Sequence, residues 1–183
     1  MSAYNLLTES QLSAAVHLSS TLPAADSYVR DGSYSGTNYG SATSLVTKNS
    51  SSGYTRTVYL SFDLSAYTAA VSEAKVRLVP TYVGAAGNVN VIAAATGAWM
   101  ENSIVWNNKP VVGAEIANWT GMAAGVAVEI DVTAEVNAAI AAGSGSVSFA
   151  VYAPTDTGST GDVIYGSKEQ TVASSRPVLT VSE

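Results

Sequence analysis

The sequence predicts an all-β fold: a jelly-roll-like antiparallel β-sandwich of about ten short strands with one short helix. The clearest observation is the run from Thr57 to Asp63, in which Val58, Leu60 and Phe62 alternate with Thr, Tyr and Ser. A period of two places these apolar side chains on one face of a half-buried strand. Similar runs recur between turns that contain Gly and Pro, and strands do not alternate with helices. This pattern favours a sandwich or barrel over a parallel sheet.

The expected elements follow one another from residue 26. The strands cover, in order, residues 26–30, 44–48, 57–63, 73–79, 88–94, 115–119, 126–132, 146–153, 162–167 and 178–181. Pro80 limits the ladder that starts at residue 73, because proline has no amide hydrogen to donate. After the seventh strand the period changes: Val136 and Ile140 are four residues apart, and Asp131 or Thr133 can cap the turn before them. This spacing predicts the single short helix.

The composition excludes several classes of partner and site. With 183 residues, of which 47% are hydrophobic, the chain is long enough for one domain with a sizeable core. A net charge of −6 provides no field that would gather phosphate groups, so we expect no nucleic-acid partner. The absence of cysteine excludes disulfides and thiolate metal sites.

The N-terminal residues differ from the remainder. We divide the chain into an N-terminal arm or extra edge segment, residues 1–24, and a β-sandwich domain, residues 25–183. Thr8-Glu9-Ser10-Gln11 has the pattern of a capping box, which indicates a helix. The alternation from Ala14 to Leu18 indicates a strand instead. Both interpretations stay open, and Pro23 ends either element.

The same segment bears on localisation. The first basic residue is Arg30, and Glu9 and Gln11 interrupt the only apolar stretch before it, so we expect no secretory signal peptide. No apolar run approaches the ~18 residues that a transmembrane helix needs. We therefore expect a protein of a virion surface or of the extracellular space, without a membrane partner.

A set of short motifs lies between residues 25 and 182. In order they are ADSYVRDG (25–32), NYG (38–40), TVYLSFDLS (57–65), SEAKVRL (72–78), WMENSIVWNNKP (99–110), IDVT (130–133), YGSKE (165–169) and RPVLTV (176–181). Together these motifs resemble the DNRLRE domain family, which overlaps carbohydrate-binding module family 96. The resemblance implies a jelly-roll-like β-sandwich, found as an accessory module of polysaccharide-degrading enzymes and in other surface proteins. It also implies binding of acidic polysaccharides such as alginate.

Binding of an acidic glycan requires aromatic faces that stack on sugar rings and basic groups that pair with carboxylates. The candidate carbohydrate-binding residues are Arg30, Tyr34, Tyr39, Lys48, Tyr54, Arg56 and Lys168. We expect Arg30, Lys48 and Arg56 to converge on one concave face with the loop tyrosines. The alternative is that the tyrosines close the open end of the sandwich and that the basic residues are merely solvated. We assign Trp99 and Trp106 to packing beneath their own loop.

A structural calcium ion is a further open question. Five aspartates stand at strand ends or in loops: Asp26, Asp31, Asp63, Asp156 and Asp162. Carboxylates suit a hard cation, but turn and cap roles explain each aspartate singly. No cofactor is therefore expected beyond such a calcium ion, and its ligands are left unassigned.

The sequence offers no catalytic constellation. The single histidine, His17, lies in the N-terminal segment, so a Ser-His-Asp triad would have to recruit it from outside the sandwich. Glu129 and Asp131 share one face of an expected strand, where solvated charge is a simpler explanation than a carboxylate pair for glycoside hydrolysis. We therefore expect a protein that is not an enzyme.

Two functional classes remain. The first is a non-catalytic structural or adhesive surface protein, in first place a phage virion decoration or fibre component. In this class residues 1–24 attach the chain to other virion or surface proteins, and the chain forms a homo-oligomer. The second is a free carbohydrate-binding module for an acidic, alginate-like polysaccharide. The lone domain, the low charge and the expected lack of a signal peptide favour the first class.

Overall fold

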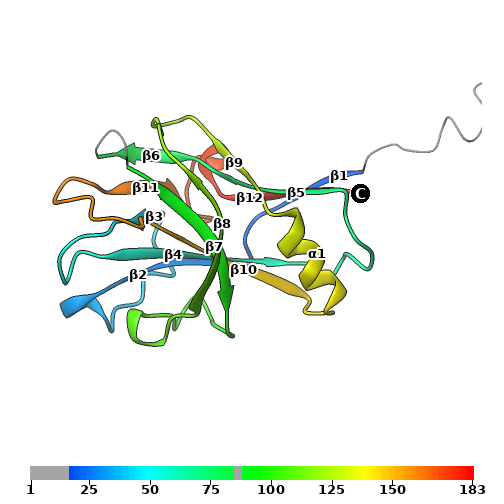
Figure 1. The fold of residues 1–183 in the computed structure, drawn as a ribbon, viewed down its shortest axis with the longest axis horizontal. Coiled ribbons are helices and arrows are strands. Elements are labelled where there is room, and N and C mark those ends of the chain that lie inside the picture. Colours follow the sequence, from blue (N-terminus) through cyan, green and yellow to red (C-terminus); the bar gives the residue numbers. More distant parts are fainter. Residues whose placement is uncertain (1–16, 85–87) are drawn as a thin grey trace, which may run out of the picture.

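The computed structural model describes residues 17–84 and 88–183. In these residues, antiparallel strands pack in two layers around one core, with a single α-helix at one end (Figure 1). The predicted all-β sandwich with one short helix is therefore confirmed. The capping-box pattern at residues 8–11 and the start of the alternation at Ala14 lie outside the described residues.

One layer is a five-stranded antiparallel sheet. Its order is β2 (Ala25–Arg30), β4 (Arg56–Asp63), β10 (Ser146–Tyr152), β7 (Asn90–Thr96) and β8 (Val111–Trp119). In this sheet β4 pairs with β2 through Arg30 and Arg56, and with β10 through Leu60 and Phe149. Strands that are distant in the sequence are thus neighbours in space, as in a jelly roll.

The opposite layer combines two smaller sheets. One has the order β1 (Leu18–Thr21), β12 (Val178–Ser182), β5 (Glu73–Leu78) and β9 (Val128–Asp131), and the other β3 (Ser44–Thr47), β11 (Val163–Gly166) and β6 (Pro80–Val83). Only Val79 separates β5 from β6, and the Gly166 N–H donates to the Val79 carbonyl at 3.3 Å. Pro80 ends the first ladder as predicted, and the chain continues directly into the other sheet.

The described residues contain twelve strands, two more than the sequence pattern predicts. Strand β6 was not predicted, because its four residues do not alternate between apolar and polar. The other additional strand, β1, agrees with the strand interpretation of the N-terminal segment: Leu18 pairs with Ser182 at the edge of the sheet. The attachment role expected for residues 1–24 stays a prediction.

The core between the layers contains the alternating face of β4. Val58, Leu60 and Phe62 are buried, and the rings of Phe62 and Phe149 lie 6.3 Å apart between centroids. The pattern predicts a half-buried strand, but Tyr59 on the opposite face of β4 is fully buried as well. The long loop before β8 covers it.

That loop, residues 97–110, forms a second small core on the outer face of the five-stranded sheet. Ile104 is buried against Val29 and Tyr59, with Trp99 and Trp106 partly buried around them. The Tyr59 hydroxyl donates to the Pro110 carbonyl at 3.0 Å, and burial raises the pKa of Tyr59. The assignment of both tryptophans to packing beneath their loop is confirmed.

The helix and the longest polar loops lie at opposite ends of the sandwich (Figure 1). Helix α1 (Thr133–Ala141) buries Val136 and packs on β10 and β5. The N-cap of this helix is Val132, whose side chain cannot cap, so the expected cap at Asp131 or Thr133 is not found. Asp131, one residue earlier, accepts hydrogen bonds from the Thr133 N–H at 2.9 Å and the Thr133 hydroxyl at 2.6 Å. Short 3₁₀ helices occur at Gly32–Tyr34, Trp106–Asn108 and Ala173–Ser175.

Candidate functional site

Three basic residues stand side by side at one end of the sandwich. In the β2–β4 pairing Arg30 is opposite Arg56, and an isolated bridge places Arg56 opposite Lys48. Residues that face each other in antiparallel strands project from the same side of a sheet. The row lies at the end that carries the loops after β2, between β3 and β4, and between β10 and β11 (Figure 1). The structure thus brings together the three residues that were expected to converge.

Two predicted tyrosines complete this group, which we call the basic–aromatic cluster: Arg30, Tyr34, Lys48, Tyr54 and Arg56. The guanidinium carbon of Arg30 lies 3.6 Å from the centre of the Tyr34 ring and 5.4 Å from that of Tyr54. Lys48 Nζ lies 5.8 Å from the Tyr54 ring centre. These distances allow cation–π attraction. Tyr34 is 42% exposed and Tyr54 50% exposed, so much of each ring is open to solvent.

The loops that carry the two tyrosines touch at a pair of glycines. Gly32 has a φ of 62°, and a Cβ on it would lie only 2.4 Å from the Gly53 Cα. No other residue type fits both this conformation and this contact. Because the loops meet there, the Arg30 Nε can donate to the Gly53 carbonyl at 2.7 Å, which fixes its side chain between Tyr34 and Tyr54.

The cations of the cluster differ in their partners. Asp162 pairs with Arg56 through one carboxylate oxygen and with Lys48 Nζ at 3.2 Å through the other. Lys48 is only 3% exposed and also donates to the Ser159 carbonyl at 2.7 Å. Arg30 has no carboxylate partner among the described residues, and its two terminal amino groups make no hydrogen bond with them. The cluster therefore keeps a net positive charge, with Arg30 free to bind an anion.

A shallow hollow lies beside the cluster. It has a volume of about 310 Å³ and is lined by Ser50, Ser51, Tyr54 and Ser159. Its serine hydroxyls can donate and accept hydrogen bonds, and its tyrosine ring supplies an apolar face. The hollow therefore combines the groups that a sugar ring contacts.

Of the two other predicted site residues, Tyr39 borders this cluster and Lys168 lies farther from it. Tyr39 stacks on Tyr28, with ring centroids 4.3 Å apart and planes inclined by 20°. The Lys168 N–H donates to Asp26, which stands four residues before Arg30 on β2, a distance of about 13 Å along an extended strand. Lys168 is therefore outside the basic–aromatic cluster, whereas Tyr39 adjoins it through Tyr28, which lies two residues before Arg30 on the same face of β2.

Lys168 belongs to a second group of charges, which we call the carboxylate cluster: Asp26, Glu101 and Glu169 with Lys168. Lys168 Nζ lies 2.7 Å from Glu101 Oε2 and 3.2 Å from Glu169 Oε1. The Asp26 N–H donates to Glu101 Oε1 at 2.8 Å, and Asp26 Oδ2 accepts from the Lys168 N–H at 2.7 Å. Burial, and then the charges of Glu169 and Glu101, raise the pKa of Asp26 to about 7.

The NYG motif holds Glu101 in this cluster. The Asn38 amide donates to the Glu101 carbonyl at 2.7 Å and to the Ile104 carbonyl at 2.8 Å. A Cβ on Gly40 would lie 2.1 Å from the Glu101 carbonyl oxygen, so only glycine permits this approach. Asp26 was a candidate from the sequence, but Glu101 and Glu169 were not, because the three residues come from segments far apart in the chain.

Four of the aspartates considered as calcium ligands have other partners. The carboxylates of three accept hydrogen bonds from nearby backbone N–H groups: Asp31 from Thr55, Asp63 from Ser65 and Asp156 from Gly158. The fourth, Asp162, makes the ion pairs described above. Asp63 and Asp156 thus have the turn role expected for them, whereas Asp31 joins two loops and Asp162 forms ion pairs, roles that were not expected.

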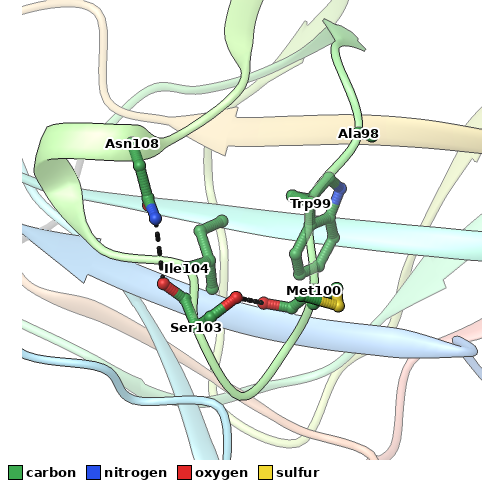
Figure 2. A pocket seen from close by; sticks show the side chains of 6 residues that line it. All are labelled: Ala98, Trp99, Met100, Ser103, Ile104 and Asn108. Atoms are coloured by element: carbon green, nitrogen blue, oxygen red, sulfur yellow. Dashed lines mark hydrogen bonds between the residues drawn. The ribbon is translucent and has the colours of Figure 1, made fainter.

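A pocket of about 360 Å³ lies in the 97–110 loop (Figure 2). The Asn108 amide donates to the Ser103 carbonyl at 3.0 Å, and the Ser103 hydroxyl donates to the Met100 carbonyl at 3.4 Å (Figure 2). The Trp99 indole donates to Ser148 Oγ at 3.2 Å. These polar groups are already engaged within the protein, and no charged residue lines the pocket. We assign it to loop packing.

The residues weighed for catalysis lie apart from both clusters. His17 Nδ1 is 3.3 Å from Glu183 Oε2 beside edge strand β1, where both side chains are exposed. Glu129 and Asp131 are exposed on β9, and Asp131 accepts hydrogen bonds from Thr133. Neither pair shares a cavity with the basic–aromatic cluster.

The structure is an antiparallel β-sandwich whose loops present exposed aromatic rings beside cations. Residues 17–183 match the sequence profile of carbohydrate-binding module family 96, and the chain belongs to that family. The resemblance of the motifs to carbohydrate-binding module family 96 is thereby confirmed, and modules of this kind are typically non-catalytic. A search of curated proteins finds no match. No helix of the described residues is long and apolar enough to cross a membrane.

Proposed function

We propose that the chain binds an acidic polysaccharide through the basic–aromatic cluster and has no catalytic activity of its own. The position of Arg30 carries this proposal. Its guanidinium group is held between two exposed tyrosine rings, and its terminal amino groups have no partner among the described residues. A planar guanidinium with free amino groups binds a carboxylate in a bidentate manner.

Each member of the cluster contributes a different interaction with a uronate polymer. Arg30 pairs with the carboxylate of one sugar, and Tyr34 or Tyr54 stacks on a neighbouring ring. Lys48 and Arg56 are tied to Asp162 and supply a positive field rather than a direct contact. Because the attraction is partly electrostatic and close to solvent, the affinity falls as the salt concentration rises.

The test compares Arg30→Gln with Arg77→Gln. Both variants lose one positive charge, but Arg77 lies on β5 in the opposite layer, where it donates to the Ser174 carbonyl. Binding to alginate and to a neutral glucan is measured by isothermal titration calorimetry. Loss of a hydrogen-bonded charge contact costs about 1.5–3 kcal/mol, so Arg30→Gln weakens alginate binding about 10- to 100-fold.

The control variant Arg77→Gln is expected to bind alginate with the affinity of the wild type. Neither the wild type nor this control is expected to bind the neutral glucan. Unchanged alginate affinity in a folded Arg30→Gln variant would exclude the basic–aromatic cluster as the site. Equal affinity for both glycans would exclude recognition of the acidic group. The virion decoration or fibre role expected from the sequence stays a prediction beside this proposal.

A further inference from the structure

Three carboxylates meet where distant segments of the chain come together. Asp26 is on β2, Glu101 in the 97–110 loop, and Glu169 follows β11. One oxygen from each of the three lies within 4.8 Å of the others. Calcium binds oxygen at about 2.3–2.6 Å, so two oxygens on the same ion are at most about 5 Å apart. The three carboxylates are thus close enough to share one ion.

Two oxygens in this cluster are buried without a partner. Asp26 is only 1% exposed, and its Oδ1 accepts no hydrogen bond from the described residues. The same holds for Glu169 Oε2. The other Asp26 oxygen is fixed by the Lys168 N–H, so the orientation of the carboxylate is set. Desolvation of a carboxylate oxygen is costly unless a donor or cation faces it.

Lys168 does not satisfy these two oxygens. Its ammonium group contacts Glu101 Oε2 and Glu169 Oε1. The unpartnered Glu169 Oε2 is the other oxygen of that carboxylate. Three carboxylates and one ammonium group leave the ionised cluster with an excess of negative charge that one divalent cation can neutralise.

We infer that Asp26, Glu101 and Glu169 bind one calcium ion. The donors are all carboxylate oxygens, which suit hard cations, and none is the histidine or cysteine that most zinc and copper sites contain. Calcium tolerates irregular geometry, whereas magnesium demands a near-ideal octahedron that three separate segments rarely supply. The ion ties β2, the 97–110 loop and the segment after β11 together.

The test uses the whole chain, stripped with a chelator and then desalted. Titration with calcium chloride in a calorimeter is expected to give one bound ion per chain. Calcium at about 100 times its dissociation constant raises the melting temperature by about 5–10 °C, as followed by circular dichroism. Magnesium at the same concentration gives a clearly smaller shift.

The variant Glu169→Gln removes one donor with nearly the same shape and is expected to lose both the bound ion and the shift. Glu129→Gln, on the exposed edge strand β9, is the matched control and keeps both. Glu101→Gln is a second variant, and only variants with the far-UV spectrum of the wild type are compared. No calcium binding by the wild type, an equal shift with magnesium, or full binding by both folded variants would overturn the inference.

Discussion

Substitution Ile104→Ala probes the small core beneath the 97–110 loop. Ile104 is 1% exposed and packs with Val29, Tyr59 and Ala150 on the outer face of the five-stranded sheet. Ile104 lies outside the regular helices and strands. Its contribution to stability therefore depends on contact between the loop and the sheet. The variant therefore measures how firmly the loop covers the outer face.

The magnitude follows from the groups that are lost. Ile→Ala removes three buried carbon groups, each worth about 0.8 kcal/mol on transfer from water, or about 2.4 kcal/mol in all. The cavity left behind adds to this, and measured losses for such substitutions are about 2–5 kcal/mol. We expect a loss of about 3–4 kcal/mol, which for this chain length lowers the melting temperature by roughly 6–16 °C.

Urea unfolding followed by two probes is the assay. Tryptophan fluorescence reports largely on the loop, because Trp99 and Trp106 lie in it, whereas far-UV circular dichroism reports on the sheets. Coincident transitions indicate that the loop unfolds with the sandwich. Met100→Ala, at a side chain that is 66% exposed in the same loop, is the control and should change stability by less than about 0.5 kcal/mol. A loss below about 1 kcal/mol for Ile104→Ala would refute the closed loop.

Two further predictions concern the backbone. In Gly40→Ala the new Cβ would lie 2.1 Å from the Glu101 carbonyl oxygen, so we expect the free energy of unfolding in urea to fall by about 1–3 kcal/mol. The control Gly36→Ala, whose Cβ would have nothing within 4 Å, should be near neutral. Equal losses for the two variants would contradict the close approach at Gly40. Asp131→Ala should lower stability by about 1 kcal/mol at pH 7 in thermal scans, because the carboxylate accepts the N–H of Thr133, a backbone donor that has no partner within the helix. Hydrogen bonds from the Thr133 hydroxyl and then its N–H lower the pKa of Asp131, so this stabilisation is present above pH ~4 and is lost as the pH falls further. A difference between wild type and variant that is constant from pH 3 to pH 7 would contradict it.

The sequence predicted those parts of the fold that depend on local periodicity. The alternation in β4 identified its inward face correctly, since a strand's two faces follow from a period of two. The burial of Tyr59 on the other face was not predictable in this way, because it depends on a loop that starts about 40 residues later. Strand β6 was missed for a similar reason: its four residues gain their pairing from β11, not from their own pattern.

The candidate sites show the same limit. Arg30, Lys48 and Arg56 could be expected to meet, because strands near one another in the chain carry them at matching ends. The contact between Lys168 and Glu101 could not be expected. The two residues lie in loops of different layers, and their separation in the sequence follows no recognisable pattern. The meeting of these two residues depends on the tertiary structure, which local sequence patterns do not reveal.

The pairing of β1 with β12 has a consequence for how the module can be mounted. Leu18 lies opposite Ser182, and the Glu183 N–H donates to the His17 carbonyl at 3.2 Å, so both ends of the described chain leave from one edge. That edge is remote from the loops that carry Tyr34 and Tyr54 (Figure 1). Adjacent ends are what domain insertion and fusion tolerate best. A domain joined at either end would therefore lie beside the edge formed by β1 and β12. The loops that carry the tyrosines, at the other end, would stay open to solvent.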